Sequence, residues 1–339
     1  MGLITKTKDV VGLSSLNVDY IYEVEDLSFL KPFYPQDEET RGWVLTDPKD
    51  IKELEILLQK KARLISRSGG GSGANTVFCM AKMGFPSGLV GKIGRDEDGE
   101  FLLQELSSIS FQHIARDQRS GKAFVVLGPS RDRIILRVPN ANATLTWADL
   151  DLDFIKGFTF LHMTSLPGEG LALQERLAAE MAPFVRISFD PGEVYARRGL
   201  PALNPILRRI EVLFMTEKEL GLLTGLPLKE SIPLVQSLGT KIVAVKRIGA
   251  GASVFQGTES WDLPAEIIRP KDMTGAGDVF AAGFLAGLLQ GQPLPICGRL
   301  GLALAHQSML GVGREAYPGR EDFERVIKKR RPELITGFS

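Results

Sequence analysis

Residues 272–289 read DMTGAGDVFAAGFLAGLL, and this stretch carries the strongest structural signal in the chain. Its small residues Gly275, Ala276 and Gly277 precede an apolar segment that predicts a helix to about Leu289. The first N–H groups of a helix lack intrahelical partners and carry partial positive charge, so this turn can bind an anion. Asp278 stands in the first turn, where its carboxylate could accept a proton from a hydroxyl that attacks a phosphoryl group. A capped helix after an ordinary glycine turn is the alternative interpretation.

A second glycine-rich stretch, RSGGGSGANT, occupies residues 67–76. Glycine and serine runs usually form flexible linkers, but they also occur where a site requires backbone without side chains. The following segment ANTVFCMAKMG predicts a helix that ends at Gly84, and SGLVGKIG then predicts a buried strand. Ordered elements therefore follow the stretch directly, and both interpretations stay open at this point.

The second half of the chain alternates strands with helices. Strand-like segments such as FTFLHMT, VRISFD, VLFMT and KIVAVKR are separated by helical patterns, among them residues 170–182 and 201–209. This alternation predicts an α/β fold with a mostly parallel central sheet covered by helices on both faces. Two β-rich stretches, at about 17–46 and 122–145, do not fit the rhythm and predict a small second sheet. Between them, DPKDIKELEILLQKKARLI predicts a helix over 48–65.

The composition is that of a globular protein with balanced charge. The 339 residues include 41 basic and 41 acidic side chains, so the formal net charge is zero. This balance argues against nucleic-acid binding through a general basic field and gives no electrostatic reason for membrane attachment. The two cysteines, Cys79 and Cys297, and the three histidines show no zinc-binding spacing. No apolar signal segment opens the sequence, and its longest apolar stretch (279–289) is too short to span a bilayer, which predicts a cytoplasmic protein.

Both glycine-rich stretches resemble signatures of one family, the ribokinase (PfkB-type) carbohydrate and nucleoside kinases. DMTGAGD is similar to the family's C-terminal signature, D-T-x-G-A-G-D, and GGGSGANTVFCMAKMGFPSGLVGKIGRDEDGEFLLQEL is similar to its N-terminal signature. Asn17-Val18-Asp19 stands where the family has an early Asn and Asp, so the resemblance runs from residue 12 to about residue 290. It implies a single ribokinase-like domain over residues 1–339 with a small β-sheet lid. It also implies a kinase that uses ATP and Mg²⁺ to phosphorylate an alcohol, usually a primary CH₂OH.

The resemblance further implies roles for individual residues. Asp278 is similar to the catalytic base, beside an anion hole made by Gly275, Ala276 and Gly277. The positions implied for binding the acceptor, with the glycine pair at the lid hinge, are Asn17, Asp19, Gly70, Gly71, Ser72 and Asn75. Asp272 stands where some members bind a monovalent cation such as K⁺. On this interpretation, residues 67–76 form a binding loop with a hinge rather than a linker.

Two motifs depart from the family pattern. The N-x-x-E motif, which helps to organise the magnesium bound to the phosphates, is matched by residues Thr216 to Glu219, with Thr in place of Asn. Thr offers a hydroxyl but no amide, which weakens the implied metal role, and a simple acid at a helix N-terminus is the alternative. The Gly-rich turn RIGAGASV (247–254) has Ile248 at the first glycine position, which leaves Gly249 and Gly251 as the implied nucleotide contacts.

The acceptor stays open between a nucleoside and a sugar or sugar acid. The path from Asp19 to Asn75 takes 56 residues, which is similar to adenosine kinases of the family and longer than in its simple sugar kinases. Aromatic side chains on this path would either cover a base or pack on one another: Phe29, Phe33, Tyr34 and Trp43.

Other classes of function fit less well. A kinase fold used as a non-catalytic ligand sensor would have no need of Asp278 beside an intact Gly-Ala-Gly turn. A dinucleotide-binding dehydrogenase would require G-x-G-x-x-G after the first strand, and residues 12–19 (GLSSLNVD) lack it. The expected partners are a small sugar or nucleoside and, since lid sheets of this family often meet in dimers, a second copy of the chain.

Overall fold

The computed structural model describes residues 8–35, 42–129 and 133–330. Its main layer is a nine-stranded sheet, parallel from β12 to β6 in sheet order, with an antiparallel edge formed by β13 and β14. The strands lie in the order β14 (Glu259–Pro264), β13 (Gly251–Gln256), β12 (Ile242–Arg247), β11 (Val212–Thr216), β10 (Arg186–Asp190), β9 (Phe158–Thr164), β1 (Lys8–Leu13), β5 (Ser87–Ile93) and β6 (Ile114–Arg116). Parallel strands end at a shared edge, so polar residues at the ends of β10 and β11 are brought together there.

Apolar side chains alternate between the two faces of the main sheet. Val10 and Phe160 belong to the core on one face, whereas Val11 and Leu161 belong to the core on the other, as the period of two in a strand requires. The first core is closed by α2 (Ser72–Lys82), α3 (Glu97–Glu105), α10 (Ala276–Leu289), α11 (Leu294–Ser308) and α12 (Arg320–Arg330). The second is closed by α4 (Leu152–Lys156), α5 (Gly170–Met181), α6 (Gly192–Ala196), α7 (Gly199–Leu207), α8 (Glu217–Thr224) and α9 (Leu228–Ser237). Short 3₁₀ helices connect some of these elements: η2 (Asn140–Thr144), η3 (Trp147–Asp149) and η4 (Arg314–Ala316).

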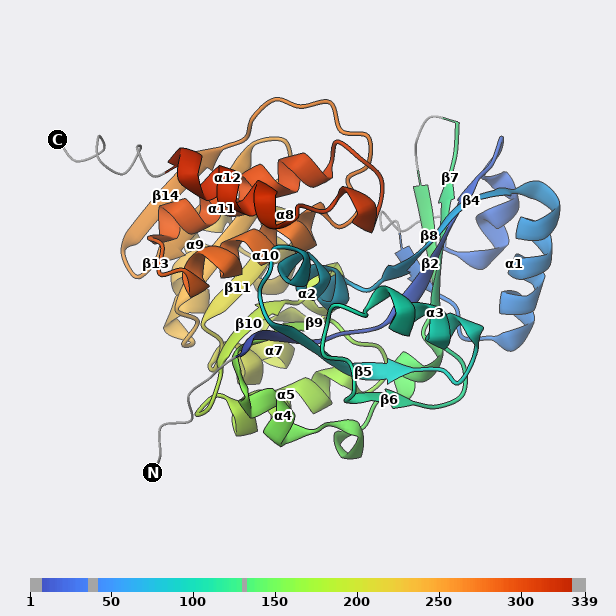
Figure 1. Ribbon diagram of the computed structural model, residues 1–339, viewed down its shortest axis with the longest axis horizontal. Coiled ribbons are helices and arrows are strands. Elements are labelled where there is room, and N and C mark those ends of the chain that lie inside the picture. Colours follow the sequence, from blue (N-terminus) through green and yellow to red (C-terminus); the bar gives the residue numbers. More distant parts are fainter. Residues whose placement is uncertain (1–7, 36–41, 130–132, 331–339) are drawn as a thin grey trace.

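A five-stranded sheet, here called the small sheet, stands beside this body (Figure 1). Its order is β3 (Gly42–Val44), β8 (Arg133–Val138), β7 (Gly121–Leu127), β2 (Asn17–Glu23) and β4 (Arg63–Gly70). One face packs on α1 (Pro48–Lys61) and η1 (Ser28–Phe33), where Leu54 and Leu58 meet Phe124 and Leu136. The opposite face turns Ile21 and Val125 toward a cleft between the small sheet and the body.

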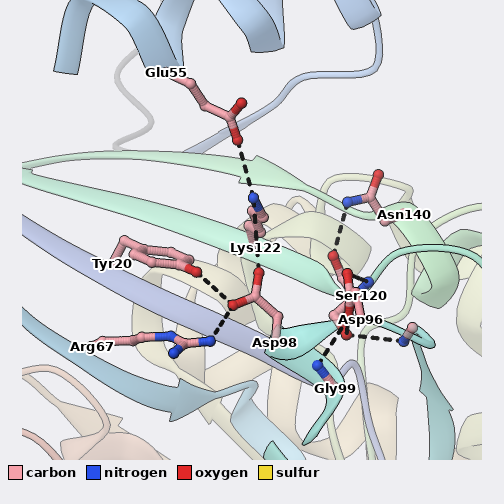
Figure 2. A network of polar contacts seen from close by, with 10 residues as sticks. Tyr20, Glu55, Arg67, Asp96, Asp98, Gly99, Ser120, Lys122 and Asn140 are labelled. Carbon is pink, nitrogen blue, oxygen red and sulfur yellow. Dashed lines mark hydrogen bonds and ion pairs between the residues drawn. The ribbon is translucent and has the colours of Figure 1, made fainter. Parts of the chain in front are cut away.

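One buried carboxylate of the body receives side chains from three strands of the small sheet (Figure 2). Asp98, in the first turn of α3, is 7% exposed. It accepts a hydrogen bond of 2.5 Å from the hydroxyl of Tyr20 on β2, and it pairs with Arg67 on β4 and with Lys122 on β7, whose Nζ lies 3.8 Å from its Oδ2. Lys122 also contacts Glu55 of α1 at 3.1 Å. Asp98 therefore ties the small sheet to the body.

A second carboxylate fixes the adjoining connection to β7 (Figure 2). Asp96 caps α3 by accepting from the backbone N–H of Gly99 at 2.9 Å. The same side chain accepts from the N–H and the hydroxyl of Ser120, at 2.9 and 2.6 Å. The start of β7 is therefore held against the helix that carries Asp98.

The structure confirms the predicted α/β fold, with a mostly parallel central sheet and a smaller second sheet. It differs from the sequence prediction at residues 48–70. The helix ends at Lys61, four residues earlier than predicted, and β4 then runs through Arg63–Gly70. Edge pairing with β2 overrides the helical periodicity here. The stretch predicted as a glycine loop is accordingly the end of a strand followed directly by α2.

No helix in the described part of the chain is long and apolar enough to cross a membrane. Cys79 and Cys297 are both buried and unpaired with each other. Burial raises the pKa of the Cys297 thiol to about 12, so this group stays protonated. Both cysteines act as small core residues.

Asp98→Leu is expected to lower the free energy of unfolding by about 3 kcal/mol, because it removes the carboxylate that pairs with the partly buried Arg67 and leaves Lys122 with Glu55 alone. Chemical denaturation followed by circular dichroism measures the change. Glu100→Gln is the control, since it removes only an exposed pair with Arg116 and is expected to cost less than about 1 kcal/mol. Equal losses in the two variants would contradict the role assigned to Asp98.

Candidate active site

The N-terminus of α10 forms the floor of the site. Gly275 precedes the helix with φ +76°, in the left-handed region that favours glycine, and a Cβ there would overlap the hydroxyl of Tyr317. The N–H of Ala276 donates to the carbonyl of Met273 at 3.3 Å. The N–H groups that follow in the first turn have no intrahelical acceptor and carry the positive end of the helix dipole. Gly277 faces Lys246, whose Nζ would lie 3.3 Å from a Cβ at that position.

Asp278 is held by two side chains from the start of α2. Ser72 donates its hydroxyl to Oδ1 at 2.5 Å, and Asn75 donates its Nδ2 to Oδ2 at 2.9 Å. Thr76 donates to the backbone carbonyl of Asp278 at 3.2 Å. Burial raises the pKa of Asp278 to about 6, against the lowering effect of the Ser72 and Asn75 hydrogen bonds. The carboxylate is therefore ionised near neutral pH and can still take up a proton.

The glycines before α2 lie so close to neighbouring residues that a side chain at each position would overlap a different neighbour. A Cβ at Gly70 would overlap the carboxylate of Asp19. A Cβ at Gly71 would overlap the carbonyl oxygen of Ser15, and its φ of +102° also favours glycine. The sequence thus provides bare backbone where β2 and β4 pass the end of β1.

Asp19 and Asn17 lie on β2, beside this glycine segment. Burial raises the pKa of Asp19 to about 7, although the nearby Arg314 and Arg137 oppose the rise. The Oδ1 of Asn17 accepts from the Nδ2 of Asn142 at 2.9 Å. Asn142 is itself buried and fixes the turn before β2 by accepting from the N–H of Leu16 at 2.8 Å. The structure therefore gathers Asn17, Asp19, Gly70, Ser72, Asn75 and Asp278 around the junction of β1, β2 and α2.

A cleft of about 2200 Å³ opens on the other side of the α10 N-terminus. Predicted residues that line it are Thr216, Glu219, Gly249, Gly251, Asp272, Ala276 and Gly277. His306 and Met309 of the C-terminal helical region line it as well, whereas the residues gathered around Asp278 do not. The start of α10 therefore borders the large cleft through Ala276 and Gly277, and Asp278 follows directly in the same helical turn.

The predicted magnesium motif is engaged within the protein. Thr216 and Glu219 form a capping box at the start of α8: the Glu219 carboxylate accepts from the N–H of Thr216 at 2.7 Å, and the Thr216 hydroxyl accepts from the N–H of Glu219 at 3.2 Å. Burial raises the pKa of Glu219, and Lys246 opposes the rise. Lys246 pairs with the buried Asp190 at 2.6 Å. In the described ranges, no group of three or more His, Cys, Asp or Glu side chains is arranged to hold a metal ion.

Asp272, the predicted cation ligand, connects two loops. Its Oδ1 accepts from the N–H of Thr274 at 2.8 Å, and its Oδ2 lies 3.4 Å from the N–H of Gly313. The carboxylate thus fixes the turn before α10 against the segment that follows α11. Arg133, from the β7–β8 hairpin, donates to the hydroxyl of Thr274 at 2.5 Å, so the small sheet reaches the same turn.

The sequence predictions did not include several charged or amide residues of this region. Lys246 and Asp190 stand at strand ends, where a charge is usually solvated, and Asn142 lies in a polar turn. Arg314 follows the last apolar helix pattern in a glycine-containing segment, GVGREAYPG. Lys246 and Asp190 could have been found from their positions at the ends of parallel strands, where sites commonly form. No local feature of the sequence distinguished Arg314.

Two carboxyl resonances are expected to titrate far above the usual range for Asp, at about 7 for Asp19 and about 6 for Asp278. NMR of protein labelled with ¹³C at the Asp carboxyl carbons measures both. The variants Asp19→Asn and Asp278→Asn assign the two signals, because each variant lacks one of them. The signal of the exposed Asp26, assigned in the same way with Asp26→Asn, is the control, since hydrogen bonds from Ser28 lower its pKa. Titration of both groups near 4 would contradict the burial described here.

The chain is similar to known proteins in sequence and in fold. The model of the pfkB family of carbohydrate kinases matches residues 51–316. An uncharacterised sugar kinase of Archaeoglobus fulgidus is 31% identical over 255 residues, 73% of this chain and 99% of its own. The cytidine kinase of Thermococcus kodakarensis is 32% identical over 260 residues, 70% of this chain and 86% of its own. The adenosine kinase of Sinorhizobium meliloti has the same fold, with a TM-score of 0.82 at 20% identity over 95% of this chain and 99% of that one. The chain belongs to the pfkB family of carbohydrate kinases.

Proposed function

We propose that this protein is an ATP-dependent kinase that transfers the γ-phosphoryl group to a hydroxyl, a primary CH₂OH group, of a nucleoside or sugar. The observation that carries the proposal is the position of Asp278. Its carboxylate is held by Ser72 and Asn75 at the N-terminus of the helix whose preceding residues face the large cleft. A base and an anion-binding helix start thus adjoin one another, as phosphoryl transfer to an alcohol requires.

In the proposed mechanism, Asp278 accepts the proton of the attacking hydroxyl. Asn17, Asp19 and the Gly70–Asn75 segment bind the acceptor on the side of Asp278. The nucleotide occupies the cleft beside Gly249 and Gly251, and the N–H groups at the start of α10, with Lys246 behind Gly277, face the transferred phosphoryl group. The small sheet acts as a lid that excludes water.

The donor set fits magnesium held mainly by phosphate oxygens and water. Mg²⁺ commonly binds proteins through only one or two carboxylates, and Glu219 lines the cleft while Asp190 is paired with Lys246. Bound there, the ion would neutralise charge on the phosphates. A related structure, a putative ribokinase II from E. coli, was solved with ATP and Mg²⁺. We also propose that the carboxylate of Asp272 binds a monovalent cation, K⁺.

The aromatic residues of the long path from β2 to α2 mostly pack on one another or in a core. Tyr34 and Trp43 stack on one another with centroids 4.4 Å apart, and Phe33 is buried in the core under α1. Phe29 lines the cleft that the mechanism assigns to the nucleotide. Since this packing explains most of the aromatic content, the path does not by itself favour a nucleobase, and the acceptor class proposed here is a sugar hydroxyl, free or within a nucleoside.

A homodimer through the lid is supported by its edges. Leu64 and Ile65 on edge strand β4 are 48% and 46% exposed, and Val44 on edge strand β3 is 52% exposed. Exposed apolar residues on an edge strand favour pairing with another chain. The proposed location is the cytoplasm, in keeping with two unpaired thiols.

Asp278→Asn is expected to lower kcat by about 10²–10⁴-fold, because the amide cannot accept the hydroxyl proton. The Michaelis constant for ATP is expected to change less than about threefold, since Asp278 does not line the cleft. The measurement is ADP release from Mg-ATP across nucleosides, pentoses, hexoses and sugar acids. Asp153→Asn, at an exposed position, is the control. Equal turnover by the wild type and the Asp278 variant would remove Asp278 from the mechanism, and silence across the panel would favour a ligand sensor.

The midpoint of the acid limb in the pH profile of kcat/KM is expected between about pH 6 and about pH 7. A base acts in its ionised form, so activity should fall as the pH decreases through the raised pKa of Asp278, about 6. Asp19, whose pKa is raised to about 7, titrates nearby and can contribute. An Asp19→Asn variant that retains a limb near 6 would identify Asp278 as its source. A profile flat down to pH 4.5 would contradict the assignment.

A further inference from the structure

Arg314 is a buried arginine with no part in the mechanism above. It is 6% exposed and lies in η4. Its Nε donates to the Oδ1 of Asn75 at 2.9 Å, its Nη1 pairs with Glu105 at 3.4 Å, and its Nη2 lies 3.4 Å from the carbonyl of Gly70. The guanidinium carbon also lies 4.9 Å from the centre of the Phe78 ring. A donor-only group is thereby fixed beside the amide that contacts Asp278.

We propose that Arg314 is a positioning residue, which orients the Asn75 amide so that its NH₂ group faces the carboxylate of Asp278. An amide has a donor end and an acceptor end. The guanidinium can only donate, so it must face the Oδ1 of Asn75, and the Nδ2 is then directed at Oδ2 of Asp278. Without Arg314, nothing described on that side requires this orientation.

The backbone that carries Arg314 is itself held firmly. Lys82 of α2 donates its Nζ to the carbonyls of Arg314, Glu315 and Tyr317, at 3.3, 2.9 and 2.6 Å. Gly313 contacts Asp272, which fixes the turn before α10. The segment 313–317 is therefore anchored both to the helix of Asn75 and to the loop that precedes Asp278.

Arg314 also contacts the end of the small sheet. Besides the contact with the Gly70 carbonyl, a Cβ at Gly69 would overlap both Arg314 and Glu105. Glu105 accepts from the N–H of Gly69 at 2.6 Å. Gly69, the first glycine of the run, therefore leaves room for the ion pair between Arg314 and Glu105. Because the end of β4 contacts both members of this pair, its position also affects the guanidinium that orients Asn75.

The inference rests on the proposed role of Asp278 as base. Loss of the Asn75 hydrogen bond and of the nearby guanidinium charge should raise the pKa at which the base titrates. The other titratable groups whose charge acts on or responds to Asp278 remain in place in an Arg314 variant: Asp190, Lys246, Asp19, Tyr317 and Cys79. Arg314 also opposes the raised pKa of Asp19, so a shift of the acid limb is assigned to Asp278 only where it also occurs in the Asp19→Asn background.

The test is Arg314→Gln, assayed as kcat and kcat/KM against pH. The expected result is an acid limb displaced upward by about half a pH unit or more, a kcat about tenfold lower at pH 7, and a KM for ATP within twofold of the wild type. In an Asn75→Ala background the same substitution should add a smaller displacement of the limb than in the wild type, because only the loss of the guanidinium charge remains. Arg320→Gln, an exposed arginine paired with Glu324, is the matched control and should leave both quantities unchanged.

Arg314→Lys tests the idea if Arg314→Gln does not fold. Lysine can keep the ion pair with Glu105, but a single ammonium does not reproduce the fork that also reaches Asn75, so a smaller displacement in the same direction is expected. An unmoved limb in a folded Arg314 variant, or an equal additional displacement in the Asn75→Ala background, would overturn the proposal. Full activity of Asp278→Asn is a separate outcome, which would overturn the proposed function beneath it.

Discussion

The carboxylate of Asp278, partly buried beside a helix start, is the constraint around which the candidate site is built. Burial disfavours its charged form, and its pKa is raised to about 6. Because the folded state holds the proton more tightly than the unfolded chain, ionising this group lowers stability as the pH rises from about 4 to about 6. Hydrogen bonds from Ser72 and Asn75, with the helix dipole, limit that cost. The chain thus retains a carboxylate at this position at the expense of stability.

The glycine run serves the same constraint from the side of the small sheet. Gly69, Gly70 and Gly71 leave space for Arg314 with Glu105, for Asp19, and for the Ser15 carbonyl, respectively. Each neighbour carries charge or a backbone acceptor that belongs to the site. The run is therefore ordered by what surrounds it, although its composition alone is that of a flexible linker.

The fold and the centre of the site could be predicted from sequence, but the charges that support the centre could not. Strand–helix alternation and the turn before α10 are local patterns, and the family resemblance implied Ser72, Asn75 and Asp278 together. Arg314 is 239 residues from Asn75, so no local pattern indicates that they meet. Lys246 and Asp190 have the sequence appearance of solvated strand ends, and only the parallel sheet brings them together. The helix over 48–65 was overextended, because the pairing of β4 with β2 lies outside its local periodicity.

The connections between the body and the small sheet have a mechanical consequence. The described chain passes between them four times: after β1, between β4 and α2, between β6 and β7, and after β8. Four covalent tethers spread along one border allow rotation about that border and resist sliding or twisting. Any change of angle must be shared by backbone torsions at all four crossings, including the left-handed Gly71. The small sheet is thus not a contiguous segment of the chain that could be excised or grafted. Its movement relative to the body is restrained by all four connections together.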